Sequence, residues 1–282
     1  MVPVGRPRRD LLAAAGFGVL VAVAVGIRVA LRHQAAIARR RIGKPFGESA
    51  PEADRVWKPG LGGEPLLLLL LGDSVAAGLG TDHRKHTPGA RLAKGLARGT
   101  RRPVRLHTAA IVGSESAALA AQLDALPAGY RPDLAVVMVG GNDVTHRIPV
   151  AESTAHLRAA IDRLRSLGAE VVVGTCPDLG ALRAVPQPLR ALGSRMSRQL
   201  ADAQDSVARA AGAHVVSLRS TVGPMFLASP EEMFSIDRFH PSAVGYRRVA
   251  DAILPVALAA LAGPSAGAAP TSAGPSTPRR AS

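Results

Sequence analysis

The chain has 282 residues, of which 47% are apolar and 3% aromatic, and its formal net charge is +14. This length and apolar content fit one globular domain with extensions and exclude a wholly disordered chain. The single cysteine, Cys176, excludes an intramolecular disulfide framework and argues against a cysteine-based zinc site. The scarcity of aromatic rings argues against a surface that stacks on nucleic-acid bases.

The positive charge is concentrated in the extensions of the chain. Residues 1–64 carry a net charge of +6, and the tail after Gly263 adds Arg279 and Arg280. This distribution favours membrane flanks over a nucleic-acid interface, because charge at the ends of an apolar segment contacts lipid headgroups. We therefore expect no nucleic-acid partner.

The N-terminal segment is predicted to be an uncleaved, single-pass membrane anchor. Leu11–Ile27 contains no charged residue and has arginines on both sides, which is near the short limit for a spanning helix. A cleaved signal peptide is the alternative, but the A-x-A sequence at residues 36–38 follows two arginines that separate it from the apolar run. Both flanks are basic, so the side of the membrane that carries the rest of the chain stays open.

Four segments are predicted along the chain. Residues 1–44 are the anchor with its basic flanks, and residues 45–64 are a polar linker that contains Trp57. Residues 65–262 form the folded domain. Residues 263–282 are rich in Pro, Ser, Ala and Gly, cannot bury a core, and are expected to be disordered.

The folded domain is organised around the sequence LLLLLLGDSVAAGLG at residues 66–80. Six leucines between Pro65 and Gly72 predict a strand that is buried on both faces, as in the centre of a parallel sheet. The turn after such a strand lies at its carboxyl end, where open α/β sheets bind ligands. Ser74 lies in this turn, either as a nucleophile or as the N-terminal cap of the next helix.

Strands and helices alternate through the rest of the domain. Further strands are predicted at residues 104–108, 133–139, 171–175 and 214–218, and helices at residues 90–98, 116–126, 152–167, 189–211 and 241–261. Continuous apolar strands between helices predict a five-stranded parallel sheet that is covered on both faces, which is a three-layer α/β fold.

Polar residues follow the first three strands and precede the last helix. Gly113 follows the second strand, Asn142 follows the third, and Asp237 and His240 come just before the helix. A histidine activates a serine when a carboxylate fixes its tautomer, and one turn brings Asp237 to His240. The backbone N–H groups of Ser74 and Gly113 and the Asn142 amide are candidate oxyanion donors. Each residue alone has a structural explanation as a turn former or cap, but their joint order indicates an active site.

These motifs resemble the conserved blocks of the SGNH, or GDSL-type, hydrolase family of esterases and lipases. The resemblance covers nearly the whole folded domain: GDS at residues 72–74 is similar to the first block, GND at 141–143 to the third, and D-x-x-H-P at 237–241 to the last. Gly113 matches the glycine of the second block. Thr108 stands about where that block often begins with asparagine, so the support of the Gly113 loop stays open.

The resemblance implies a flavodoxin-like SGNH hydrolase fold and an acyl-enzyme mechanism that needs no cofactor and no metal. In this mechanism Ser74 is the nucleophile, His240 is the base and Asp237 orients the histidine. Ser74, Gly113 and Asn142 form the oxyanion hole.

Other polar residues carry weaker signals. The sequence DHRKH at residues 82–86 imitates a metal site, but the neighbouring arginine and lysine would repel a cation. His146 and Arg147 either line the substrate pocket or lie in a solvated loop. Cys176 is expected to be a small buried residue.

The sequence thus predicts a membrane-anchored carboxylic ester hydrolase that acts on a small-molecule or lipid ester. Within the enzyme class, a thioesterase or a carbohydrate O-deacetylase is the alternative. From a different class, the alternative is a catalytically silent, membrane-tethered binding domain that keeps the pocket.

Overall fold

The computed structural model describes the backbone of residues 7–263 and the side chains of residues 22–263. Its centre is a six-stranded sheet in the order β1-β3-β2-β4-β5-β6. The strands are β1 (Val56–Trp57), β2 (Leu66–Gly72), β3 (Val104–Thr108), β4 (Leu134–Met138), β5 (Glu170–Gly174) and β6 (His214–Val216). β2 to β6 run parallel to their neighbours, whereas β1 pairs with β3 in the antiparallel direction.

The prediction of five parallel strands is correct for β2 to β6 but wrong in the total, because β1 makes the sheet a mixed one of six strands. β1 lies in the segment expected to be a linker. It has only two residues, which is too few for a periodic pattern that would predict a strand. One local hydrogen bond and one tertiary hydrogen bond hold this segment in place instead. Trp57 is buried and donates from Nε1 to the Ala53 carbonyl at 3.2 Å, and Asp54 Oδ2 accepts from the Thr108 N–H at 2.8 Å.

β2 is the central strand, and its leucines pack on both sides of the sheet. Leu68 and Leu70 belong to the core cluster that contains α3 (Pro88–Thr100) and α11 (Ala243–Ala262). Leu69 and Leu71 belong to the cluster that contains α6 (Val150–Ser166). Successive strand residues point to opposite faces, so burial on both faces explains the unbroken apolar run.

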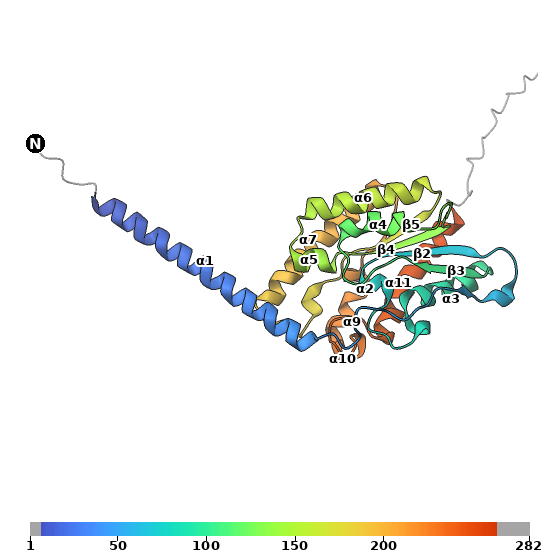
Figure 1. The fold of residues 1–282 in the computed structure, drawn as a ribbon, viewed down its shortest axis with the longest axis horizontal. Helices are drawn as coiled ribbons and strands as arrows, with labels where there is room; N and C mark the ends of the chain where they lie inside the picture. The colour runs from blue at the N-terminus through green and yellow to red at the C-terminus, as the bar shows by residue number, and fades with distance from the viewer. Residues whose placement is uncertain (1–6, 264–282) are drawn as a thin grey trace, which may run out of the picture.

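Two helical layers cover the sheet (Figure 1). α3 and α11 lie on one face, while α4 (Leu119–Asp124), α6 and α7 (Leu189–Ala210) lie on the other. Shorter elements lie in the connections: α2 (Ser74–Ala77), α5 (Gly141–His146), α8 (Leu218–Thr221), α9 (Gly223–Ala228), α10 (Pro230–Met233), and the 3₁₀ turns η1 (Pro59–Leu61), η2 (Arg84–His86), η3 (Ser116–Ala118) and η4 (Leu179–Ala181). The parallel strands have the flavodoxin-like order, which puts the binding crevice at the carboxyl ends of β2 and β4.

Helix α1 (Pro7–Ile42) projects from the body, and its C-terminal part contacts the region around the start of α7 (Figure 1). Within the described residues, no helix combines the length and the apolar character that a membrane crossing requires. The structure therefore does not support the span expected at Leu11–Ile27, and residues 11–21 of that span lie outside the residues whose side chains are described. The tail expected at 263–282 also lies outside the described residues, apart from residue 263.

Candidate active site

The structure brings Ser74, His240 and Asp237 into one hydrogen-bonded chain. His240 Nε2 lies 2.9 Å from Ser74 Oγ, and His240 Nδ1 lies 2.6 Å from Asp237 Oδ2. Ser74 begins α2 directly after β2, whereas the other two residues lie in the loop before α11. The imidazole therefore lies between a hydroxyl and a carboxylate, which is the arrangement that proton transfer from the hydroxyl requires.

Asp237 is buried and well provided with hydrogen-bond donors. Its Oδ1 accepts from the backbone N–H groups of Phe239 at 2.9 Å and His240 at 3.0 Å. Burial alone would raise the pKa of Asp237, but the His240 side chain and these backbone donors outweigh it, so the pKa lies below its usual value. An ionised carboxylate keeps the imidazole proton on Nδ1 and leaves Nε2 able to accept the Ser74 proton.

A backbone hydrogen bond within the loop holds the segment that carries His240, and Phe239 and Gly80 pack against this residue. The Ser235 N–H donates to the His240 carbonyl at 2.8 Å, and the Phe239 ring packs edge-on against the imidazole. Gly80 approaches from the turn after α2 with a φ of 103°. A Cβ at this position would lie 2.8 Å from His240 Cβ and 2.7 Å from the Pro241 carbonyl oxygen, so only glycine permits this approach.

The three candidate oxyanion donors line one cavity of about 770 Å³ together with His240. The Ser74 N–H is in the first turn of α2 and has no acceptor within that helix. Among the described residues, the Gly113 N–H has no acceptor either, and its φ of 84° favours glycine. Asn142, the single asparagine of the chain, donates from Nδ2 to the Ser114 carbonyl at 2.9 Å and retains a second amide N–H.

Gln122 supports the Gly113 loop, a role that the sequence alone did not predict. Its side chain is buried and bridges the backbone at the end of β2: Oε1 accepts from the Gly72 N–H at 2.9 Å, and Nε2 donates to the Gly72 carbonyl at 2.8 Å. Nε2 also contacts Ser114 Oγ at 3.2 Å. Gln122 thus ties the loop to β2, although Thr108 replaces the usual asparagine. The available signal was one amide in the apolar pattern of residues 116–126.

Two buried carboxylates lie beneath the site, on the turns after β2 and β4. Asp143 accepts from the Ser116 N–H at 3.1 Å and from Ser153 Oγ at 2.7 Å, so it also fixes the start of η3. Asp73 caps α2 by accepting from the Val75 N–H at 2.9 Å. Burial raises the pKa of Asp73 to about 6; the nearby Asp143 adds to this rise, and the bond from Val75 opposes it.

A second, smaller cavity of about 90 Å³ lies beside Ser74. Its lining is mostly apolar and includes Met138, Val139, Leu182, Leu218, Val222 and Phe226. Ser74, Asn142 and His240 line both cavities, so these three side chains lie where the two spaces meet.

The structure places the remaining candidates from the sequence in three different environments. His146, whose Nδ1 lies 2.6 Å from Glu115 Oε1, lines the larger cavity together with Arg147, so these two residues belong to a pocket wall. Cys176 is buried as predicted, and burial raises the pKa of its thiol well above the usual value. His83 accepts a hydrogen bond from a backbone N–H of its own turn, and the part of the chain that is described contains no cluster of three metal-ligating side chains.

The strand order, the site at the carboxyl ends of β2 and β4 and the comparisons below together define an SGNH hydrolase-like α/β fold. Residues 70–248 match the GDSL-like Lipase/Acylhydrolase family, and the chain belongs to this family. It is 42% identical over 260 residues to the GDSL-like esterase Rv1075c of Mycobacterium tuberculosis, a match that covers 87% of this chain and 82% of the relative. It is also 36% identical over 106 residues to the esterase TesA of Pseudomonas aeruginosa, over 38% of this chain and 52% of TesA.

Solved structures agree with this assignment. The crystal structure of TesA superposes with a TM-score of 0.54 and 27% identity, covering 67% of this chain and 97% of that chain. LAE5, an alpha/beta hydrolase enzyme from the metagenome of Lake Arreo, has a TM-score of 0.54 at 23% identity over 71% of this chain and 98% of that one, and it shows the fold alone. The resemblance found in the sequence is therefore confirmed, and the protein is a carboxylic ester hydrolase.

Proposed function

We propose that the protein hydrolyses esters through a triad of Ser74, His240 and Asp237 and an acyl-enzyme. The observation that carries this proposal is the chain of two hydrogen bonds, 2.9 Å from Ser74 to His240 and 2.6 Å from His240 to Asp237. His240 Nε2 takes the Ser74 proton as Oγ bonds to the ester carbonyl carbon. His240 then protonates the leaving alcohol, and a water molecule that the same imidazole activates releases the acid.

The donors around the larger cavity stabilise the negative charge that develops on the carbonyl oxygen. The backbone N–H groups of Ser74 and Gly113 and the second amide N–H of Asn142 supply this stabilisation. It acts without further reorganisation, because the Gly113 loop is already fixed by Gln122 and by the Asn142 contact.

The two cavities divide the ester between them. The apolar lining of the smaller cavity fits the acyl group, and the larger cavity takes the alcohol part. One water-sized group needs about 10–15 Å³ of such a volume, so a cavity of about 90 Å³ admits a short acyl chain.

Covalent labelling of the full-length protein with a fluorophosphonate tests the proposal. We expect an adduct on Ser74, located by peptide mass, because only an activated serine attacks this probe readily. The His240→Ala variant is expected to lose the adduct, whereas His156→Ala, which removes an imidazole from α6, keeps it. A folded protein without an adduct would contradict the triad and favour the silent binding domain.

The Asn142→Ala variant is expected to have a kcat about 10²- to 10³-fold lower with little change in KM, because its amide acts mainly on the charge of the transition state. The measurement is steady-state hydrolysis of a short acyl ester. Gln199→Ala, which removes an exposed side-chain amide from α7 outside both cavity linings, is the control and is expected to stay within about twofold of the wild type. An unchanged kcat in Asn142→Ala would contradict the proposal that this residue is part of the oxyanion hole.

A further inference from the structure

The larger cavity has a wall that lies outside the family match, which begins at residue 70. This wall consists of residues 31–48, the C-terminal part of α1 and the turn after it, and we call it the α1 wall. Its apolar side chains Leu31, Ile42 and Phe46 line the same cavity as Ser74 and His240. The cavity therefore joins the reactive groups to a segment that precedes the hydrolase motifs.

The α1 wall is fixed against the body by polar and apolar contacts. Gln34 Oε1 accepts from the Leu189 N–H at 2.9 Å, Arg41 Nη1 donates to the Ala184 carbonyl at 3.4 Å, and Ala38 is buried. Leu189 begins α7 and itself lines the cavity, as does Met196 one to two turns later. Apolar side chains of α1 and α7 thus line the same cavity as Ser74 and His240.

Basic side chains dominate the charge of this cavity. Those in its lining are Arg32, Arg39, Lys44, Arg147 and Arg190. The acidic residues of the lining are Glu48, which pairs with Lys44, and Asp237, which pairs with His240. Among the described residues, none of the four arginines forms an ion pair with a carboxylate.

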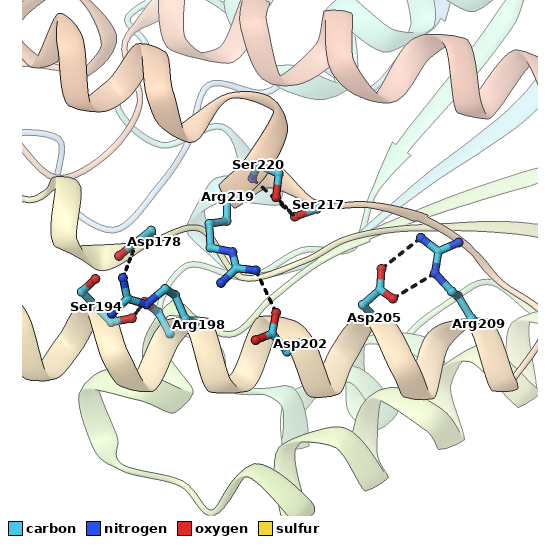
Figure 2. Close-up of polar contacts among 10 residues, drawn as sticks. Asp178, Ser194, Arg198, Asp202, Asp205, Arg209, Ser217, Arg219 and Ser220 are labelled. Carbon is cyan, nitrogen blue, oxygen red and sulfur yellow. Dashed lines mark hydrogen bonds and ion pairs between the residues drawn. The ribbon is translucent and has the colours of Figure 1, made fainter.

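Arg209 on α7 and Arg219 on α8 show a different pattern. In Figure 2, Arg209 pairs with Asp205 and Arg219 pairs with Asp202, each at 2.9 Å. In the described part of the chain, the arginines of the cavity form no such ion pair. Cations that line a concave, partly apolar space raise the local concentration of anions, and guanidinium groups bind carboxylate and phosphate with two parallel hydrogen bonds.

We propose that the α1 wall is part of the substrate site and that its arginines select esters whose alcohol part carries an anionic group. The inference rests on the proposed function, which places the acyl group in the smaller cavity and the alcohol in the larger one. An apolar segment of the alcohol lies between α1 and α7, and its anionic end contacts the guanidinium groups.

Two acetate esters of equal chain length test this selection on the full-length protein. Hexyl acetate has a neutral alcohol part with a terminal methyl group. In 6-acetoxyhexanoate a carboxylate takes the place of that methyl group, so the two alcohol parts have the same number of carbon atoms. We expect a higher kcat/KM for the anionic ester and an advantage that shrinks as salt is added. Arg39→Gln is expected to lower kcat/KM for 6-acetoxyhexanoate by about fivefold to tenfold and to leave hexyl acetate within about twofold.

The matched control is Arg40→Gln, which removes the same charge from the next position of α1, outside the cavity lining. Arg40→Gln is expected to leave kcat/KM unchanged for both esters. The position of the wall is tested by Ala35→Trp, which adds a large side chain to the cavity lining and is expected to lower kcat/KM for both six-carbon esters more than for methyl acetate. Ala30→Trp, on an exposed part of α1 outside the lining, is its control.

The outcomes separate this inference from the proposed function. Equal kcat/KM for the two esters in the wild type, or equal losses in Arg39→Gln and Arg40→Gln, would overturn the role of the α1 wall while leaving the esterase intact. Hydrolysis of neither ester by a protein whose Ser74 still reacts with the fluorophosphonate would also overturn the substrate class alone. If the wild type neither hydrolysed an ester nor reacted with the fluorophosphonate, both the proposed triad and this inference would be overturned.

Discussion

The Ser74→Ala variant is expected to lose about 10⁴- to 10⁶-fold in kcat for a short acyl ester, because no other atom replaces Oγ as the nucleophile. The substitution removes one hydroxyl whose bond in the structure is to His240. The backbone of the turn stays supported, since the Gly78 and Leu79 N–H groups donate to the Ser74 carbonyl and Asp73 still caps α2. Steady-state kinetics and thermal unfolding of the same preparation measure both effects.

A double variant provides the control for this prediction. If Ser74 and His240 act as one unit, Ser74→Ala/His240→Ala is expected to be no slower than either single variant, because the second change removes nothing that still functions. If Ser74→Ala turned over the ester as fast as the wild type, the proposed mechanism would be contradicted. Multiplying losses in the double variant would instead show that the two side chains act independently.

The central sheet is predictable from the sequence because β2, β4 and β5 are buried on both faces and therefore apolar throughout most of their length. β2 and β3 carry continuous or alternating apolar residues between clear breaks, and the expected strand at 104–108 matches β3 residue for residue. β1 and the short helices α8, α9 and α10 have two to six residues each, which is too few for a periodic pattern. Tertiary packing decides their conformation, so sequence patterns leave them undetermined.

The same distinction applies to the site. Ser74, Asn142 and His240 are recognisable because their residue types, at the ends of successive strands, carry chemistry of their own. Gln122 is not recognisable in this way, since its role depends on contacts with Gly72, which is 50 positions away in the chain. Its function in the loop becomes visible only when β2 and α4 are placed side by side.

The basic residues after the apolar N-terminal run show how a correct pattern leads to an incomplete interpretation. Arginines that flank an apolar segment are typical of membrane anchors, and the sequence alone favours that interpretation. The structure places Arg32 and Arg39 in the lining of the cavity that contains Ser74. That placement depends on how α1 packs against α7, and no local pattern encodes the position of one helix relative to another.

The Asp237→Asn variant is expected to lower kcat by about 10⁴-fold, although it changes the shape of the side chain very little. Asparagine can donate a hydrogen bond to His240 Nδ1, which moves the imidazole proton to Nε2. Nε2 then donates toward Ser74 Oγ and cannot accept its proton. Asp251→Asn, on an exposed part of α11, removes the same charge and is expected to stay within about twofold of the wild type.

The difference in stability between the wild type and Asp237→Asn is expected to be larger at neutral pH than in acid. The pKa of Asp237 is lower in the folded protein than its usual value of 3.8, so the carboxylate stabilises the fold above that value and loses this contribution as the pH falls through the folded-state pKa. Thermal unfolding should therefore show the variant to be less stable than the wild type near neutral pH, with a gap that narrows in acid. A gap that is independent of pH would contradict the ionised state of Asp237.

Comparison with Asp237→Ala separates the tautomer of His240 from the loss of charge. Alanine neither accepts nor donates, so it leaves His240 free to reach either tautomer, whereas asparagine favours the one that cannot accept the proton. A lower kcat in Asp237→Asn than in Asp237→Ala would assign the difference to the tautomer. Equal losses would instead mean that Asp237 acts through its negative charge, by stabilising the imidazolium that forms when Ser74 gives up its proton.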